Sequence, residues 1–113
     1  MPTPTWIVES VAGDVDLASA PELRARLKDL IDPGPTFVVL DLSELVFIDS
    51  TGLGVLVGVH RRVKEAGGEV RLASAGPRIM RVLSVTGLDR VFVTFPTVAE
   101  AIQASPEDGQ TGD

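Results

Sequence analysis

The chain alternates between runs of apolar residues and stretches in which apolar residues recur at helical spacing. Residues 6–12 are rich in β-forming side chains, and residues 37–42 form a nearly continuous apolar run. Such a run indicates a strand that is covered on both faces, as in a parallel sheet with helices on each side. We also expect strands at residues 69–73 and 91–95, and a strand end at residues 46–48.

Four helices are expected between and after these strands. The first opens at Ser19-Ala20-Pro21-Glu22, a capping box with proline in the first turn, and continues as an apolar stripe at i, i+4, i+7 and i+8. The second covers residues 51–66 and is apolar almost all round in its first half, so we expect it to be largely buried. A third helix follows Gly76-Pro77, and Thr97-Val98-Ala99-Glu100 is a second capping box that opens a short last helix.

Strands that alternate with helices predict an α/β fold, with a mixed, mostly parallel central β-sheet flanked by about four α-helices. The 113 residues fit one small domain, which can bury roughly 60–70% of the surface of its unfolded chain. We expect residues 1–5 to be a loose lead-in, residues 6–104 to form the domain, and residues 105–113 to be a disordered acidic tail. Gly13-Asp14 is expected to turn the chain after the first strand.

Composition narrows the possible functions. The chain has a net charge of −6, no cysteine and one histidine, so it has no disulfide framework, no thiolate metal site and no multi-histidine site within one chain. The ten Lys and Arg residues are spread along the sequence, which argues against nucleic-acid binding, and the acidity suits a basic partner surface. No segment has the length of a membrane span or the form of a signal peptide, so we expect a cytoplasmic protein.

The motifs of common enzymes and of cofactor binding are missing. There is no Gly-x-x-x-x-Gly-Lys phosphate loop and no Gly-x-Gly-x-x-Gly opening a helix, so we expect no cofactor. A Ser–His–acid triad would need His60, which lies ten residues after Ser50 on the same predicted helix, about 15 Å away by helical rise. We therefore expect His60 to be a solvated or packed helix residue.

Two features of the sequence allow more than one interpretation. Asp14, Asp16 and Asp49 would form a carboxylate cluster for a metal if their loops are adjacent, but Asp14 and Asp16 would more simply bond to the turn and the helix start. Gly54 and Gly58 share a helix face. We favour close packing against the sheet as their role, with close approach of a partner as the alternative.

The chain is organised around Asp49-Ser50-Thr51, where an apolar run stops and an apolar helix begins. All three residue types cap helices, because their side-chain oxygens accept hydrogen bonds from the first free N–H groups. Ser50 lies where these N–H groups and the helix dipole favour negative charge, so a phosphate added there could be held by the same groups. The plain alternative is a well-capped helix with no further role.

The segment Phe47-Ile48-Asp49-Ser50-Thr51-Gly52-Leu53-Gly54 resembles the signature of STAS-domain anti-sigma factor antagonists, the anti-anti-sigma factors of bacteria. The likeness runs from near Trp6, through Gly13-Asp14-Val15-Asp16, to near Ala104. The family usually has one more strand before the strand at Trp6, so the resemblance leaves that edge of the sheet open. It implies a small STAS-like α/β domain that is a regulator and not an enzyme.

In that family the serine after the aspartate is phosphorylated by the anti-sigma factor, which is itself a serine kinase. The resemblance therefore implies that Ser50 is the phosphoacceptor, that the unphosphorylated protein binds the anti-sigma factor and frees sigma, and that a serine phosphatase resets it. It also implies a partner-binding face around Ser50, made of Asp16, Asp49, Thr51, Gly52 and Leu53. Thr51 could be modified as well or instead.

Two other functions compete with this switch. One is a non-catalytic STAS scaffold or adaptor subunit of a stress-signalling or transport complex, which would assemble stably without dependence on Ser50. The other is a small enzyme or nucleotide-binding domain, which the missing phosphate loop, base and ligand set disfavour.

Overall fold

A computed structural model describes residues 4–31 and 35–104 of the chain. The expected elements at residues 1–3 and 105–113, including the acidic tail, lie outside this part. In chain order the elements are β1 (Trp6–Ser10), β2 (Gly13–Val15), α1 (Ala20–Ile31), β3 (Phe37–Asp41), β4 (Leu45–Ile48), α2 (Ser50–Glu65), β5 (Glu69–Ala73), α3 (Pro77–Val85), the 3₁₀ turn η1 (Leu88–Arg90), β6 (Val93–Phe95) and α4 (Val98–Gln103).

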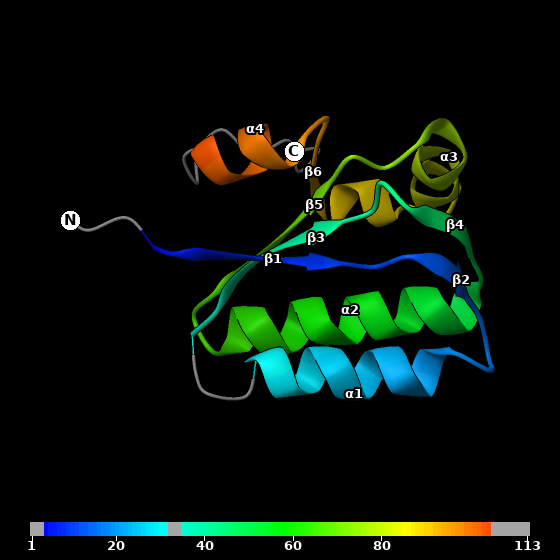
Figure 1. Cartoon of the computed structure of the whole chain (residues 1–113), viewed down its shortest axis with the longest axis horizontal. Helices are drawn as coiled ribbons and strands as arrows, with labels where there is room; N and C mark the ends of the chain where they lie inside the picture. The colour runs from blue at the N-terminus through cyan, green and yellow to red at the C-terminus, as the bar shows by residue number, and fades with distance from the viewer. Residues whose placement is uncertain (1–3, 32–34, 105–113) are drawn as a thin grey trace.

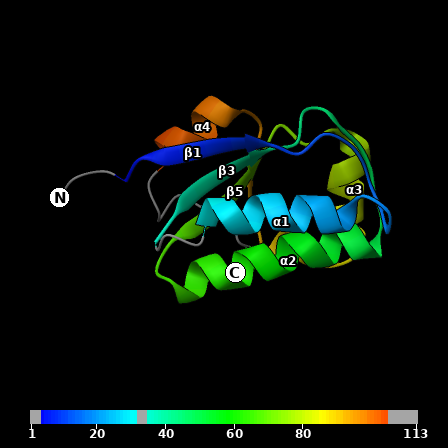
Figure 2. The ribbon, with the colours of Figure 1, turned by 60° about the horizontal axis from the view of Figure 1, so that its bottom comes forward.

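The predicted α/β fold is confirmed. The strands form a four-stranded sheet in the order β1-β3-β5-β6 and a two-stranded sheet of β2 and β4. Every pairing between the described strands is parallel. Figures 1 and 2 show α1 and α2 side by side on one face of the main sheet and α4 on the other face. Within the described residues β1 is an edge strand of the main sheet.

Burial on both faces of β3 explains its continuous apolar run. Val38 and Leu40 belong to the large core that the sheet shares with α1 and α2, whereas Val39 belongs to a small core beneath α4 with Ala73 and Ala101. Helix α2 also buries the apolar side chains of its first half, as its pattern predicts. Among the helices of the described segments, none is both long enough and apolar enough to cross a membrane.

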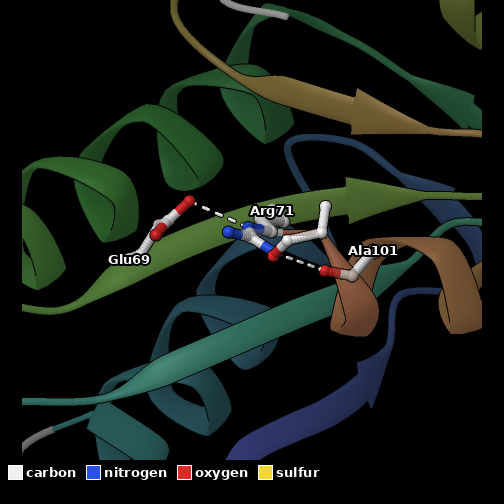
Figure 3. Close-up of polar contacts among 4 residues, drawn as sticks. Glu69, Arg71 and Ala101 are labelled. Atoms are coloured by element: carbon white, nitrogen blue, oxygen red, sulfur yellow. Dashed lines mark hydrogen bonds and ion pairs between the residues drawn. The ribbon is translucent and has the colours of Figure 1, made fainter. Parts of the chain in front are cut away.

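A buried arginine joins the last helix to the sheet (Figure 3). The side chain of Arg71, in β5, is 1% exposed, and its Nε donates a 2.8 Å hydrogen bond to Glu69. Its guanidinium also donates to the carbonyl oxygens of Ala101 and Ala104 and lies 4.3 Å from the centroid of the Trp6 ring. The charge is therefore satisfied within an otherwise apolar layer, and α4 is held against the strands.

Two local predictions are corrected by the structure. Gly13-Asp14 does not turn the chain but begins β2, because these residues pair with β4. The strand expected at residues 91–95 begins only at Val93, because η1 holds the preceding residues in a helical turn. The capping box at the last helix is confirmed, since the Thr97 hydroxyl oxygen accepts from the Glu100 N–H at 3.1 Å.

Candidate functional site

The pairing of β2 with β4 brings two loops together that are far apart in the sequence. Val15 is in register with Ile48, and the backbone N–H of Asp49 donates to the carbonyl oxygen of Val15 at 3.1 Å. Because the two strands are parallel, the residues that follow them leave the same edge of the sheet. The loop that begins at Asp16 therefore lies beside the Asp49-Ser50 junction.

Asp49 is the N-cap of α2. Its backbone is extended, with φ −102° and ψ −174°, and its side chain accepts a 3.0 Å hydrogen bond from the N–H of Gly52. Its carbonyl oxygen accepts from the N–H of Leu53 at 2.9 Å, as in the first turn of a helix. Asp49 is half-buried, and Ser50, the first helical residue, is exposed.

The next two motif residues are buried. A Cβ atom at Gly52 would lie 2.7 Å from side-chain carbons of Ile48 and Val15 and 2.8 Å from the carbonyl oxygen of Val15, so only glycine fits here without a shift. Leu53 is 8% exposed and belongs to the large core. Both residues position the start of α2 and present little surface to a partner, whereas Thr51 is half-buried.

Asp16 closes the neighbouring turn. Its Oδ1 accepts from the N–H groups of Ala18 and Ser19 at 3.0 and 3.1 Å, and the Ser19 hydroxyl oxygen accepts from the Asp16 N–H at 3.0 Å. The reciprocal cap therefore joins Asp16 to Ser19, and α1 begins at Ala20. This arrangement is the simpler of the two interpretations of Asp16, because its carboxylate is engaged in the turn and the helix start.

The site has no arrangement for a metal. Across residues 4–31 and 35–104, no group of three or more His, Asp or Glu side chains is placed to hold a metal ion. What the site offers is a helix N-terminus with an exposed hydroxyl. The Asp49 carboxylate at the N-cap complements the positive end of the α2 dipole, and Arg62 and Lys64 in the last turn complement the negative end.

Exposed apolar side chains flank this hydroxyl, and the sequence pattern gave little sign of them. Leu17, next to Asp16, is 74% exposed, and in β4 Val46 and Phe47 are 58% and 46% exposed. Solvent exposure of apolar residues beside a polar site is typical of a protein interface. Val46 and Phe47 are consecutive residues of β4, so their side chains point to opposite faces of the strand, and the apolar run at residues 46–48 gave no sign that both are exposed.

His60 lies away from this site and packs as a helix residue. Its ring is 5.1 Å from the ring of Phe92, centroid to centroid. Its Nδ1 is buried and has no hydrogen-bond partner among the described residues. Burial lowers the pKa of His60 below its ordinary value of 6.5, and the nearby charge of Lys64 lowers it further.

The prediction that Gly54 and Gly58 allow close packing of α2 against the sheet was wrong. A Cβ atom at either position would meet nothing within 4 Å, so neither glycine is needed for packing against the sheet. Both lie on the side of α2 that faces α1 and solvent, where they line a groove with α1.

Comparison with known proteins gives the family. The sequence model of the STAS domain matches residues 3–101. The anti-sigma-B factor antagonist of Bacillus subtilis (strain 168) is 39% identical over 79 residues, which are 70% of this chain and 72% of that protein. This chain belongs to the STAS domain family, among the anti-sigma factor antagonists. The anti-sigma-F factor antagonist RsfB of Mycobacterium tuberculosis is 28% identical over 95 residues, 84% of this chain and 77% of that protein.

Solved structures of STAS proteins have the same fold. The crystal structure of a putative anti-sigma factor antagonist from Thermotoga maritima superposes with a TM-score of 0.77 at 29% identity and covers 85% of each chain. The antagonist SpoIIAA in its unphosphorylated form gives a TM-score of 0.73 at 26% identity, over 90% of this chain and 89% of that one. The phosphorylated form of the Bacillus SpoIIAA gives 0.67 at 26% identity, over 90% and 92%.

Proposed function

We propose that this STAS protein is an anti-sigma factor antagonist controlled by phosphorylation of Ser50. The unphosphorylated chain binds an anti-sigma factor that is also a serine kinase, and this frees the sigma factor. Phosphorylation of Ser50 releases the chain, and a serine phosphatase returns it to the binding form. The chain itself acts in the cytoplasm as a regulator without catalytic activity.

The exposure of Ser50 at the first position of α2 carries this proposal. A kinase needs the hydroxyl to be accessible, and among the three motif residues Asp49-Ser50-Thr51 only Ser50 is exposed. Thr51 is half-buried, which favours Ser50 as the acceptor. SpoIIAA, which has the same fold, has been solved in a phosphorylated form, so this fold accepts such a modification.

Charge explains how a phosphate would change binding without unfolding the domain. Phosphoserine adds about −1.5 to −2 charges at pH 7. The N-terminus of α2 tolerates that charge, because its N–H groups and the helix dipole favour anions. A partner surface that fits a neutral hydroxyl between Asp16 and Asp49 does not tolerate the added charge. It would have to accommodate a dianion beside two carboxylates.

The proposed partner face combines this hydroxyl with exposed apolar side chains. Leu17 and Phe47 lie on the two segments that flank Ser50, and each would bury apolar area against a partner. Asp16 and Asp49 hold the two loops in place, and Gly52 and Leu53 act through the position of α2. The face is therefore pre-formed, which limits the ordering cost of binding.

A paired pull-down tests the proposal. Wild-type protein, Ser50→Asp and Ser84→Asp serve as baits in lysate of the source organism, and bound proteins and Ser50 phosphorylation are read by mass spectrometry. Ser84 is an exposed serine on α3 and controls for an added charge elsewhere. We expect wild type and Ser84→Asp to capture an ATP-binding kinase that Ser50→Asp does not capture, and ATP to release it from wild type.

The opposite result would favour a scaffold. If all three baits bring down the same large assembly and Ser50 is unmodified, the switch is excluded and the adaptor role takes its place. If Thr51 carries the phosphate and Thr51→Ala abolishes release, the switch stands but the acceptor is wrong.

A further inference from the structure

The outer edge of β1 is unpaired within the described residues. β1 stands at the end of the strand order of the main sheet, and Figure 2 shows it outside β3. The Val11 N–H donates to the Asp41 carbonyl oxygen on the β3 side. Since backbone groups alternate in direction along a strand, those of Trp6, Val8 and Ser10 point away from β3. These outward groups are available to a further strand.

The side chains of β1 favour such pairing. The strand begins with three strong β-formers and contains no proline or lysine. Ile7 and Val8 are 37% and 44% exposed, and because they are consecutive they present apolar surface on both faces of the strand. An edge of this kind can pair with another chain, and proteins usually protect it with a charge, a proline or a covering segment.

Arg26 of α1 lies across this edge. Its Nη2 donates a 2.9 Å hydrogen bond to the carbonyl oxygen of Ser10, which is one of the outward groups, and its Nε lies 3.3 Å from a carboxylate oxygen of Glu9. The Arg26 side chain is 51% exposed, so the ion pair adds little to stability. Its two contacts instead hold a positive charge where an incoming strand would have to cover it.

We propose that Arg26 guards β1 against pairing with the β1 strand of a second copy of this chain. The outward groups are spaced symmetrically about Val8, so an antiparallel pair with Val8 on the two-fold axis is self-complementary. In that pair the Ser10 carbonyl oxygen would accept from the Trp6 N–H of the second copy. The Arg26 guanidinium occupies this position and excludes the second strand. The inference goes beyond the proposed switch and does not depend on Ser50.

Sedimentation equilibrium of the full chain tests the guard. We expect wild type to stay monomeric and Arg26→Ala to form a dimer, with a dissociation constant lower by about tenfold or more. Arg24→Ala removes an exposed arginine from the same helix and should behave as wild type. Arg26→Met keeps an aliphatic stem without the charge and should dimerise as Arg26→Ala does.

A cysteine at the centre of β1 identifies the surface that pairs. The chain has no cysteine of its own. Val8→Cys on the Arg26→Ala background would place two thiols opposite each other, with Cα atoms about 5.5 Å apart, which a disulfide spans. We expect oxidation to crosslink this double variant rapidly. Val8→Cys with Arg26 present, and the exposed control Ser84→Cys with Arg26→Ala, should crosslink slowly.

A lysine at the same position tests the pairing without oxidation. Val8→Lys on the Arg26→Ala background should restore the monomer, because two lysines would lie directly opposite each other. A dimer that survives Val8→Lys, or that does not crosslink through Val8→Cys, would place the interface elsewhere and overturn the proposal. It is also overturned if Arg26→Ala and Arg26→Met both stay monomeric, or if wild type dimerises as strongly as they do.

Discussion

The backbone N–H of Asp49 donates a 3.1 Å hydrogen bond to the carbonyl oxygen of Val15. This bond continues the pairing of β2 with β4 and holds the turn at Asp16 beside the start of α2. We therefore expect a partner that contacts Ser50 to contact the turn as well. The proposed partner face is built from two chain segments that are each short and locally capped.

The cap on α2 should contribute measurably to stability. Asp49→Ala removes the acceptor for the Gly52 N–H and is expected to lower the free energy of unfolding by about 1 kcal/mol, within a range of roughly 0.5–2. Asp49→Asn keeps an oxygen acceptor and should lose much less. Urea denaturation of both variants measures the difference. Equal losses would mean that the charge of Asp49, and not its hydrogen bond, supports the helix start.

Gly52 should be intolerant of even the smallest side chain. In Gly52→Ala the new methyl group would lie within 3 Å of Val15 and Ile48, so we expect a loss of about 1–3 kcal/mol from overpacking. Gly54→Ala is the matched control in the same helix and should gain up to about 1 kcal/mol, because its methyl group enters open space. Chemical denaturation measures both, and a stable Gly52→Ala would show that β2 can move away from α2.

Removal of the buried guanidinium should loosen the last helix. Arg71→Leu leaves the carbonyl oxygens of Ala101 and Ala104 without their donor and Glu69 without its cation. We expect a loss of about 2–4 kcal/mol, with faster amide hydrogen exchange in α4 than in α2. Arg78→Leu, at an exposed position of α3, should stay within about 0.5 kcal/mol of wild type. Uniformly faster exchange in both helices would show that Arg71 supports the whole domain instead.

Stability should fall as the pH drops below the ordinary pKa of histidine. The pKa of His60 is lowered in the folded chain, so just below pH 6.5 the unfolded chain binds more protons, and acidification favours unfolding. We expect a constant melting temperature above about pH 7.5 and a decline from about pH 6.5 downward, until the folded pKa is passed. His60 is the only histidine in the chain, so His60→Gln should flatten the profile between about pH 7.5 and 5.5. A decline that persists in His60→Gln would assign it to carboxylates.

The regular elements follow from local patterns, and the sequence predicted them well. The apolar run at β3 correctly indicated burial on both faces, and the Thr97–Glu100 box marked the start of α4. The sequence likewise predicted Asp49 and Ser50 at the start of α2, because a cap is specified by residues three apart. The role of Ser50 as phosphoacceptor stays a prediction.

The remaining features depend on contacts that local patterns do not encode. β2 has three residues, too few to show a period, and it forms only because β4 pairs with it from some thirty residues away. The sequence predicted a capping box of Ser19 with Glu22 before α1, whereas the hydrogen bonds in the structure join Asp16 with Ser19. Whether Gly54 faces the sheet or α1 depends on where α1 lies, and the sequence of α2 alone does not encode this position.

The bonds of Arg71 also bear on the order in which the chain can fold during synthesis. The guanidinium is part of β5, but the two carbonyl oxygens that accept its hydrogen bonds come 30 and 33 residues later. While the ribosome is still making α4, Arg71 has only Glu69, the Trp6 ring and water as partners, so the sheet face around it stays exposed to water. This layer closes only after residue 104 has left the exit tunnel, which makes the final turn of α4 the step that completes the nascent domain.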